Sequence, residues 1–217
     1  MPHPTIAALR SLVDSRFPAS ARRTGDGVRT GVPAIDDALG GGLPPGRLTE
    51  LVSPAAGTGG QSILARILHT TRQARQRVAL IDAADGFAPD SVPLDDLRHL
   101  VWVRPGNMTT ALAAADVLVR DGNYAVVILD LRGLAERALR SAPASHWHRL
   151  HRAAESRPAA ILVQTTTDLV PAVPWRLALR EPLGLEARRT PRDDLVARLQ
   201  VEIVRGHVHL PAEELAG

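Results

Sequence analysis

The sequence predicts one α/β domain with a mostly parallel central sheet, helices on both faces and an antiparallel hairpin at the C-terminal end. Continuous apolar runs of strand length, such as 77–83 (RVALIDA) and 124–131 (YAVVILDL), are typical of strands buried on both faces. Segments with apolar residues at helical spacing alternate with these runs. Strand–helix–strand order with right-handed crossovers gives a parallel sheet covered on both sides.

Composition sets the first limits on function. The 217 residues, 45% of them apolar, are enough for one hydrophobic core. The chain has no cysteine, which excludes disulfides and thiolate metal sites and fits a cytoplasmic protein. No apolar run has membrane-spanning length, so no membrane partner is expected. The formal net charge is only +3, which by itself gives weak support to nucleic-acid binding.

The first 30 residues are expected to form an amphipathic helix and a linker ahead of a core domain at 31–210, with a short tail at 211–217. Between residues 5 and 17 the apolar side chains fall on one stripe that ends in Phe17, and Pro18 ends the helix. The small, polar and glycine-containing residues that follow have linker composition.

A glycine-rich loop is predicted between a strand at 48–52 and a helix whose apolar face includes Ile63 and Leu64. Such loops cradle phosphate with backbone N–H groups and use a following lysine and hydroxyl residue for the outer phosphates and magnesium. This chain contains no lysine. The residues of the loop are Gly57, Gly59 and Gly60 for backbone freedom, Gln61 beside Gly60 where the lysine is expected, and Ser62 as the hydroxyl. A plain strand-to-helix turn is the alternative.

From Gly31 to Leu210 the chain resembles the RecA-like recombinase core, on the IDDALGGGLPPGR turn and the strand that precedes the loop. The form ELVSPAAGTGGQ at 50–61 is most similar to the ImuA-type accessory proteins of bacterial translesion synthesis, which keep the architecture and lose the lysine. The resemblance implies a degenerate nucleotide loop and a RecA-like fold.

The same resemblance assigns vestigial roles to the ends of three later strands. The family's catalytic glutamate aligns with Ala84, with Asp85 one position further along. Asp130 aligns with the aspartate that holds magnesium through water, and Gln164 with the glutamine that senses the γ-phosphate. A solvated carboxylate at a strand end is the plainer interpretation of Asp85.

An arginine-rich stretch at 132–157 lies where the RecA-like proteins hold their first DNA-contacting loop. The candidate DNA contacts are Arg137, Arg140, Trp147 and Arg149. A solvated helix anchored in the core by Trp147 is the alternative. The histidines at 146, 148 and 151 lack a carboxylate or cysteine to complete a metal shell, so no metal is expected.

The last third of the chain departs from the recombinase pattern. After the strand at 159–164, the short, proline-containing segment 165–174 replaces a long glycine-rich DNA loop, so strand exchange is not expected. Strands are predicted at 175–186 and 194–204, and a turn at Arg205 and Gly206 leads into a hairpin partner at 207–210. The arginines at 188, 189 and 192 indicate a basic patch or a solvated turn.

The resemblance implies a non-catalytic accessory protein, a pseudo-ATPase, in the SOS response to DNA damage and in mutagenic translesion synthesis. Its implied partners are an inactive Y-family polymerase-like protein and an error-prone C-family polymerase, with RecA and single-stranded DNA as further candidates. Phe17 resembles an aromatic anchor between adjacent subunits, which would give self-association. The alternative is that its helix packs on the core of its own chain. No cofactor is expected, ATP included.

Two alternatives from other classes stay open. One is an active DNA-dependent ATPase of the recombinase or KaiC-like type, in which an arginine or a neighbouring subunit replaces the lysine, with Arg66 as the candidate within the chain. The other is a simple single-stranded-DNA-binding module.

Overall fold

The computed structural model describes residues 27–206 of the chain. The helix expected at 5–17 with Phe17, and the hairpin partner expected at 207–210, lie outside this range. Within it, no helix combines the length and the hydrophobicity that crossing a membrane requires.

Seven strands form one sheet in the order β3-β2-β4-β5-β1-β6-β7. All neighbours are parallel except β6 and β7, which are antiparallel. This confirms the predicted fold class. The strands are β1 Leu48–Val52, β2 Val78–Asp82, β3 Leu100–Val103, β4 Val126–Asp130, β5 Ala160–Thr165, β6 Trp175–Ala178 and β7 Glu202–Arg205.

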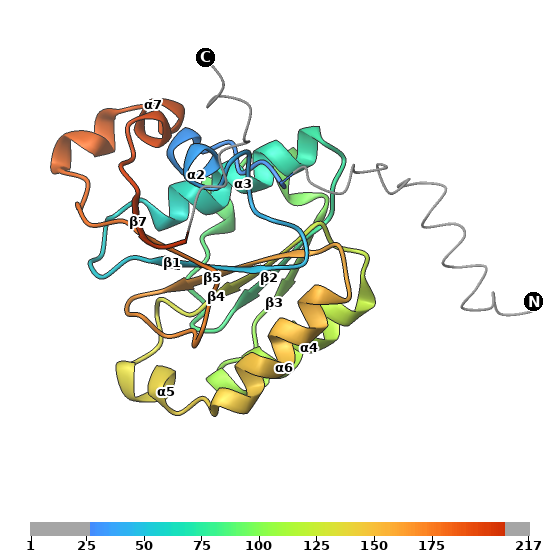
Figure 1. Ribbon diagram of the computed structural model, residues 1–217. Helices are drawn as coiled ribbons and strands as arrows, with labels where there is room; N and C mark the ends of the chain where they lie inside the picture. The colour runs from blue at the N-terminus through green and yellow to red at the C-terminus, as the bar shows by residue number, and fades with distance from the viewer. Residues whose placement is uncertain (1–26, 207–217) are drawn as a thin grey trace, which may run out of the picture.

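Helices cover both faces of the sheet (Figure 1). On one face lie α2, α3 and α7, and on the other lie α4 and α6, with α5 leading into α6 (Figure 1). The helices are α2 Pro33–Ala38, α3 Gly60–Gln73, α4 Met108–Asp121, α5 Glu136–Arg140, α6 Ala144–Glu155 and α7 Arg192–Ala197, with short 3-10 turns at Pro89–Ser91, Leu94–Leu97 and Leu185–Arg189.

The core has two layers, one on each face of the sheet. Leu64 and Leu68 of α3 pack with Leu80 and Ile128 in the first layer, and all four are fully buried. Met108 of α4 belongs to the second layer, beneath α4 and α6. The four central strands β2, β4, β5 and β1 are buried along their whole length, which explains the continuous apolar runs of β2 and β4.

Local signals account for the ends of α4. Asn107 caps the helix by accepting a hydrogen bond from Thr110 N at 3.0 Å, and Gly122 ends it with φ of 75°. These two signals set the bounds of α4 at Met108 and Asp121.

The strands expected at 175–186 and 194–204 are wrong in their extent. β6 ends at Ala178, and residues 192–197 form α7 instead of a strand. Pro191 just before α7, and Asp193 and Asp194 in its first turn, are helix-start signals that outweigh the apparent alternation. Only Glu202–Arg205 is extended, and it pairs with β6.

Candidate functional site

Three polar residues stand side by side where adjacent strands end. The sheet register pairs Asp82 with Asp130 and Asp130 with Gln164, at the carboxyl ends of β2, β4 and β5. All three lie on the α3 side, because residues two and four positions earlier in each strand pack in the layer under α3. Ligands of parallel α/β sheets bind at this edge.

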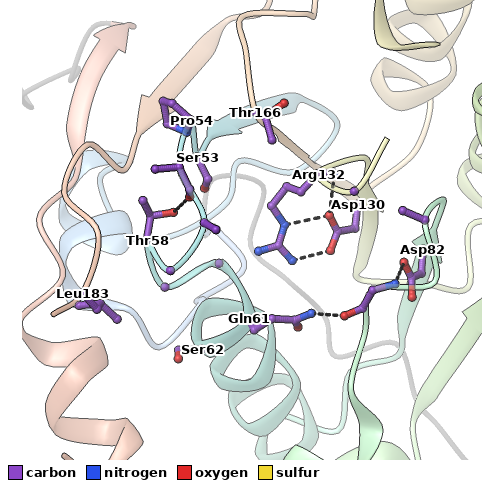
Figure 2. Close-up of a pocket in the computed structure, with 18 residues that line it drawn as sticks. Ser53, Pro54, Thr58, Gln61, Ser62, Asp82, Asp130, Arg132, Thr166 and Leu183 are labelled. Atoms are coloured by element: carbon purple, nitrogen blue, oxygen red, sulfur yellow. Dashed lines mark hydrogen bonds and ion pairs between the residues drawn. The ribbon is translucent and has the colours of Figure 1, made fainter. Parts of the chain in front are cut away.

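A cavity of about 500 Å³ opens at the same edge, in front of the glycine-rich loop (Figure 2). Its walls are the loop itself, the start of α3, and the segments that follow β2, β4, β5 and β6. The lining residues are Ser53 to Ser62, Asp82, Ala84, Gly86, Asp130, Arg132, Gly133, Thr166 and Leu183.

The glycines of the loop have conformations that other residues rarely adopt. Gly57 has φ of 80°, and Gly59, which precedes α3, has φ of 95°. A side chain at Gly59 would also press on Leu199, and Leu183 N donates a hydrogen bond of 2.9 Å to Gly57 O. The segment after β6 therefore holds the outer side of the loop.

Arg132 is the site residue that the sequence analysis did not single out. Its Nε and Nη2 donate to the two carboxylate oxygens of Asp130, at 2.9 and 2.5 Å, and its backbone N donates to Oδ1 at 3.2 Å. The side chains are 17% and 5% exposed. Figure 2 shows the guanidinium between Asp130 and the loop. A Cβ at Gly60 would overlap Nη1, so Arg132 fills the space into which a lysine at position 60 would project.

The end of β2 offers no carboxylate to the cavity apart from Asp82. Its oxygens accept hydrogen bonds from Gly86 N and Phe87 N, both at 2.9 Å, and from Trp102 Nε1 at 3.3 Å. Asp82 thus fixes the turn after β2. Ala84 lines the cavity at the position aligned with the catalytic glutamate.

Asp85 faces a second, adjacent cavity of about 550 Å³. It has φ of 54° and contacts Arg104 at 3.4 Å. It does not line the cavity in front of the glycine loop, so the structure gives it the solvated role that was the plainer interpretation.

Polar side chains in and near the loop differ in whether their atoms have hydrogen-bond partners. Gln61 Nε2 donates to Gly86 O at 2.5 Å and ties α3 to the turn after β2, and Ser62 lines the cavity. Ser53 Oγ and both amide atoms of Gln164 are buried and have no hydrogen-bond partner within residues 27–206.

The segment after β5 is fixed by a buried carboxylate. Glu50 of β1 is fully buried and accepts hydrogen bonds from Leu169 N at 2.8 Å and Val170 N at 3.0 Å. Arg176 of β6 donates Nε to the other oxygen of Glu50 at 2.5 Å and Nη2 to Val170 O at 2.9 Å. These bonds fix the short segment 165–174, which lies at the position of the long glycine-rich DNA loop in the recombinase pattern.

Arg66 does not reach the glycine loop, so its expected role as a lysine substitute is wrong. Its Nε donates to Gly31 O at 3.1 Å, and its Nη1 pairs with Asp193 of α7 at 2.9 Å. Arg66 therefore fastens the entry to α2 and α7 onto α3.

The candidate DNA contacts lie on α5 and α6. Arg137 is exposed, Arg140 pairs with Glu136, and Arg149 contacts Asp116 of α4 at 3.4 Å. Trp147 was expected to stack on a base, but it is only 1% exposed and packs in the layer under α4 and α6. This contradicts the stacking role and supports the alternative of a core anchor.

Metal binding is not favoured by the arrangement of side chains. Among the described residues, no three histidine, aspartate or glutamate side chains come together in a way that could hold a metal ion.

Comparison with known proteins relates more than half of this chain to the protein RecA. Protein RecA of Streptomyces venezuelae is 32% identical over 106 residues, which cover 48% of this chain and 28% of that protein. Protein RecA of Chlorobium chlorochromatii is 36% identical over 117 residues, 51% of this chain and 32% of the relative. Protein RecA of Synechocystis is 32% identical over 133 residues, 57% of this chain and 37% of the relative.

The chain thus spans about a third of the length of each of these relatives. The model of the RecA N-terminal domain matches residues 16–138, more than half of the chain, and this region includes the glycine loop, Asp130 and Arg132. A parallel sheet with a glycine loop after β1 and an aspartate at the end of β4 agrees with that match. The chain belongs to the RecA N-terminal domain family.

Proposed function

We propose that this protein is a RecA-like accessory factor of DNA-damage-induced mutagenic translesion synthesis that does not hydrolyse ATP. It acts by contacts with an inactive Y-family polymerase-like protein and an error-prone C-family polymerase, with RecA and single-stranded DNA as further partners. The role in DNA repair follows the names of the RecA relatives, and the accessory role follows the ImuA-like form of the loop.

The observation that carries the proposal is the closed ion pair of Arg132 and Asp130. In a working loop, the aspartate at the end of this strand holds magnesium through water. Here both of its oxygens accept hydrogen bonds from a guanidinium that is itself largely buried. Removing one partner from a buried ion pair costs about 3–5 kcal/mol. Magnesium would have to overcome a cost of this kind before it reached Asp130.

The end of β2 supports the same conclusion. A general base contributes roughly 10²–10⁴-fold to the rate of a proton-transfer step. Ala84 cannot accept a proton, and Asp85 faces another cavity, where it meets Arg104. We therefore expect this cavity neither to bind magnesium nor to activate a water for hydrolysis.

The loop after β5 supports a role other than strand exchange. In a recombinase this region must rearrange around DNA, according to the resemblance. Here Glu50 and Arg176 hold it by three hydrogen bonds to Leu169 and Val170, and a fourth bond joins the two side chains to each other. Such a fixed loop is suited to present a constant surface to a protein partner.

Genetic complementation tests the proposal in cells. Deleting the gene should reduce damage-induced mutation frequency and leave homologous recombination frequency unchanged, and the wild-type chain should restore mutagenesis. The double variant Asp130→Asn/Arg132→Gln, which removes the carboxylate and its cation together, should restore it equally well, because no metal has to bind there. A loss of recombination, or normal damage-induced mutagenesis in the deletion strain, would argue against the accessory role.

ATP turnover tests the rival interpretation on the purified chain. We expect phosphate release at background level with and without single-stranded DNA. Turnover well above background that Asp130→Asn abolishes would replace the accessory role with that of a DNA-dependent ATPase.

A further inference from the structure

The connections that lead into five of the strands carry charge of one sign. They are the segments between a helix or 3-10 turn and the strand that follows it, at 39–47, 74–77, 98–99, 122–125 and 156–159. These segments contain no aspartate or glutamate, and their arginines are Arg47, Arg75, Arg77, Arg98 and Arg157. Because the five strands are parallel, the connections all lie at one edge of the sheet, here called the amino edge, opposite the edge that holds the two cavities.

Backbone hydrogen bonds show that the connections stand side by side. Ala125 N donates to Arg77 O at 2.8 Å, and Ala160 N donates to Ala125 O at 2.9 Å. On the far side of β5, Ile161 N donates to Arg47 O at 3.0 Å. Neighbouring strands are about 4.8 Å apart, so from β3 to β1 the amino edge presents positive charge over roughly 20 Å. An extended polypeptide of about six residues covers this length.

The arginines of the amino edge are only weakly engaged by the rest of the chain. Arg47 pairs with Glu155 at 2.7 Å, but the two side chains are 53% and 54% exposed, and exposed pairs of this kind contribute little to stability. Arg75 and Arg157 are exposed, and their side chains have neither an ion pair nor a hydrogen bond to another residue within 27–206. They follow the ends of α3 and α6, where a cation is favoured near the last carbonyl groups, yet they do not donate to these groups. Their guanidinium groups are therefore available to a partner.

Tyr124 lies in the middle of this row, just before β4. It is half-buried and packs against the layer under α4 and α6. Burial and the nearby Asp121 raise the pKa of its hydroxyl, and Arg77 acts in the opposite direction, so the ring lies within electrostatic range of Arg77. On the other side, the Arg157 guanidinium lies against Gly122, with Nη1 3.5 Å from the position that a Cβ would take there. Tyrosine and arginine are among the residues that contribute most to protein–protein binding.

Carboxylates at the border of the row indicate which kind of partner it fits. Asp121 and Glu155 are the last residues of α4 and α6, and Asp95 lies in the 3-10 turn before β3. A nucleic-acid strand carries a negative charge at every phosphate, so part of it would lie against these carboxylates. A polypeptide can place acidic residues opposite the arginines and neutral residues opposite the carboxylates. The border therefore favours a protein segment over nucleic acid.

We propose that the arginines of the amino edge, with Tyr124 among them, form the docking surface for an acidic, extended segment of a partner protein. The proposal rests on the proposed function for the existence of such a partner, and it adds where the partner binds and what charge it carries. The surface lies at the edge away from the glycine loop, so neither ATP nor a metal takes part in the contact. Its test uses the purified chain and synthetic ligands, so a negative result there is distinguishable from a failure of genetic complementation.

Fluorescence anisotropy with a labelled peptide of alternating glutamate and serine tests the surface on the full chain. This peptide should bind at low ionic strength, and a peptide of alternating glutamine and serine should not, because the attraction depends on the carboxylates. An oligothymidylate with the same number of charges should bind more weakly than the acidic peptide. Absence of binding by the acidic peptide would overturn the proposal. Tighter binding of the oligothymidylate would overturn it as well, in favour of nucleic acid as the ligand.

Variants locate the binding within the molecule. Arg75→Gln/Arg157→Gln removes two exposed charges of the amino edge and should weaken binding of the acidic peptide on the order of tenfold. Arg189→Gln/Arg198→Gln is the matched control, since it removes two exposed arginines from the segment between β6 and β7. The control should bind the peptide normally. Both double variants should have the Tm of the wild-type chain, because they change only exposed side chains.

Two results with these variants would overturn the assignment to this edge. One is unchanged affinity in Arg75→Gln/Arg157→Gln, which would place the peptide elsewhere on the chain. The other is an equal loss in both double variants, because binding would then depend only on the net charge of the chain.

Discussion

Glu50 of β1 and Arg176 of β6 lie directly opposite each other on neighbouring parallel strands, with Arg176 Nε 2.5 Å from Glu50 Oε2. The Glu50 side chain has no exposed surface, and that of Arg176 is 14% exposed. Together they join the two strands to the loop after β5, so we expect them to stabilise the carboxyl edge of the sheet.

Arg176→Ala should lower the free energy of unfolding by about 3–5 kcal/mol, because it leaves the buried Glu50 carboxylate without its cation. Urea denaturation followed by far-UV circular dichroism measures the change. Arg180→Ala is the matched control, since Arg180 pairs with Glu202 at the same distance range but with both side chains more than half exposed. A similar loss in both variants would contradict the special role of the buried pair.

Gly60→Ala should destabilise the fold by about 1–3 kcal/mol, because the new methyl group collides with the Arg132 guanidinium. Intrinsic helix propensity acts in the opposite direction, since alanine favours a helix more than glycine does. Gly86→Ala has free space around the new atom and serves as the control. A double-mutant cycle with Arg132→Ala should show that most of the cost of Gly60→Ala disappears when the arginine is shortened; additive effects would place Arg132 elsewhere.

The stability of the fold should decrease as the pH falls below the ordinary pKa of histidine. Burial lowers the pKa of His99, whose Nε2 is 2.8 Å from Thr71 Oγ1, and the nearby Arg72 lowers it further. Burial also lowers the pKa of His151 on α6. Because these groups take up a proton less readily in the folded state, the stability present above about pH 6.5 is lost progressively below it, down to the folded-state pKa values.

Thermal unfolding at pH 7.5 and pH 5.5 measures this effect. His99→Gln, which retains a hydrogen-bonding side chain without a titratable ring, should reduce the difference in Tm between the two pH values. A difference that is unchanged in His99→Gln and in His151→Gln would assign the pH dependence to other groups.

Trp147→Ala should cost about 3–5 kcal/mol of stability, since it removes a large side chain from the layer under α4 and α6. Val117→Ala on α4, where the side chain is 66% exposed, should change stability by less than about 0.5 kcal/mol. Guanidinium titration of both variants makes the comparison. A stable Trp147→Ala protein with weakened single-stranded-DNA binding would restore the stacking role.

The parts of the fold that follow from burial could be predicted from the sequence. The runs at 77–83 and 124–131 are largely apolar because β2 and β4 are covered on both faces. A continuous apolar run of this length indicates a buried strand directly, without any need to choose between two periodicities. The region 194–204 could not be resolved in the same way. Its apolar residues Val196 and Leu199 are three apart and both buried, which suits a helix, while a period of two also fits so short a stretch.

The candidate site was predictable only where a residue type carries its own signal. The loop glycines and Asp130 have a recognisable order along the chain. Arg132 was one arginine among many in its stretch, and its role depends on meeting Asp130 and Gly60 in space. The absence of a side chain at Gly60, together with an arginine two residues after Asp130, is the signal that could have identified this contact.

The strand order makes the family-matching region incomplete as a folding unit. β1, which leads into the glycine loop, has β5 and β6 as its two neighbours, and both come after residue 138, where the match to the family model ends. A fragment truncated there would leave β1 unpaired on either side and detached from β4. The loop can therefore reach its native arrangement only when the later part of the polypeptide is present. A shortened version of the chain that keeps this loop native has to extend at least through β6.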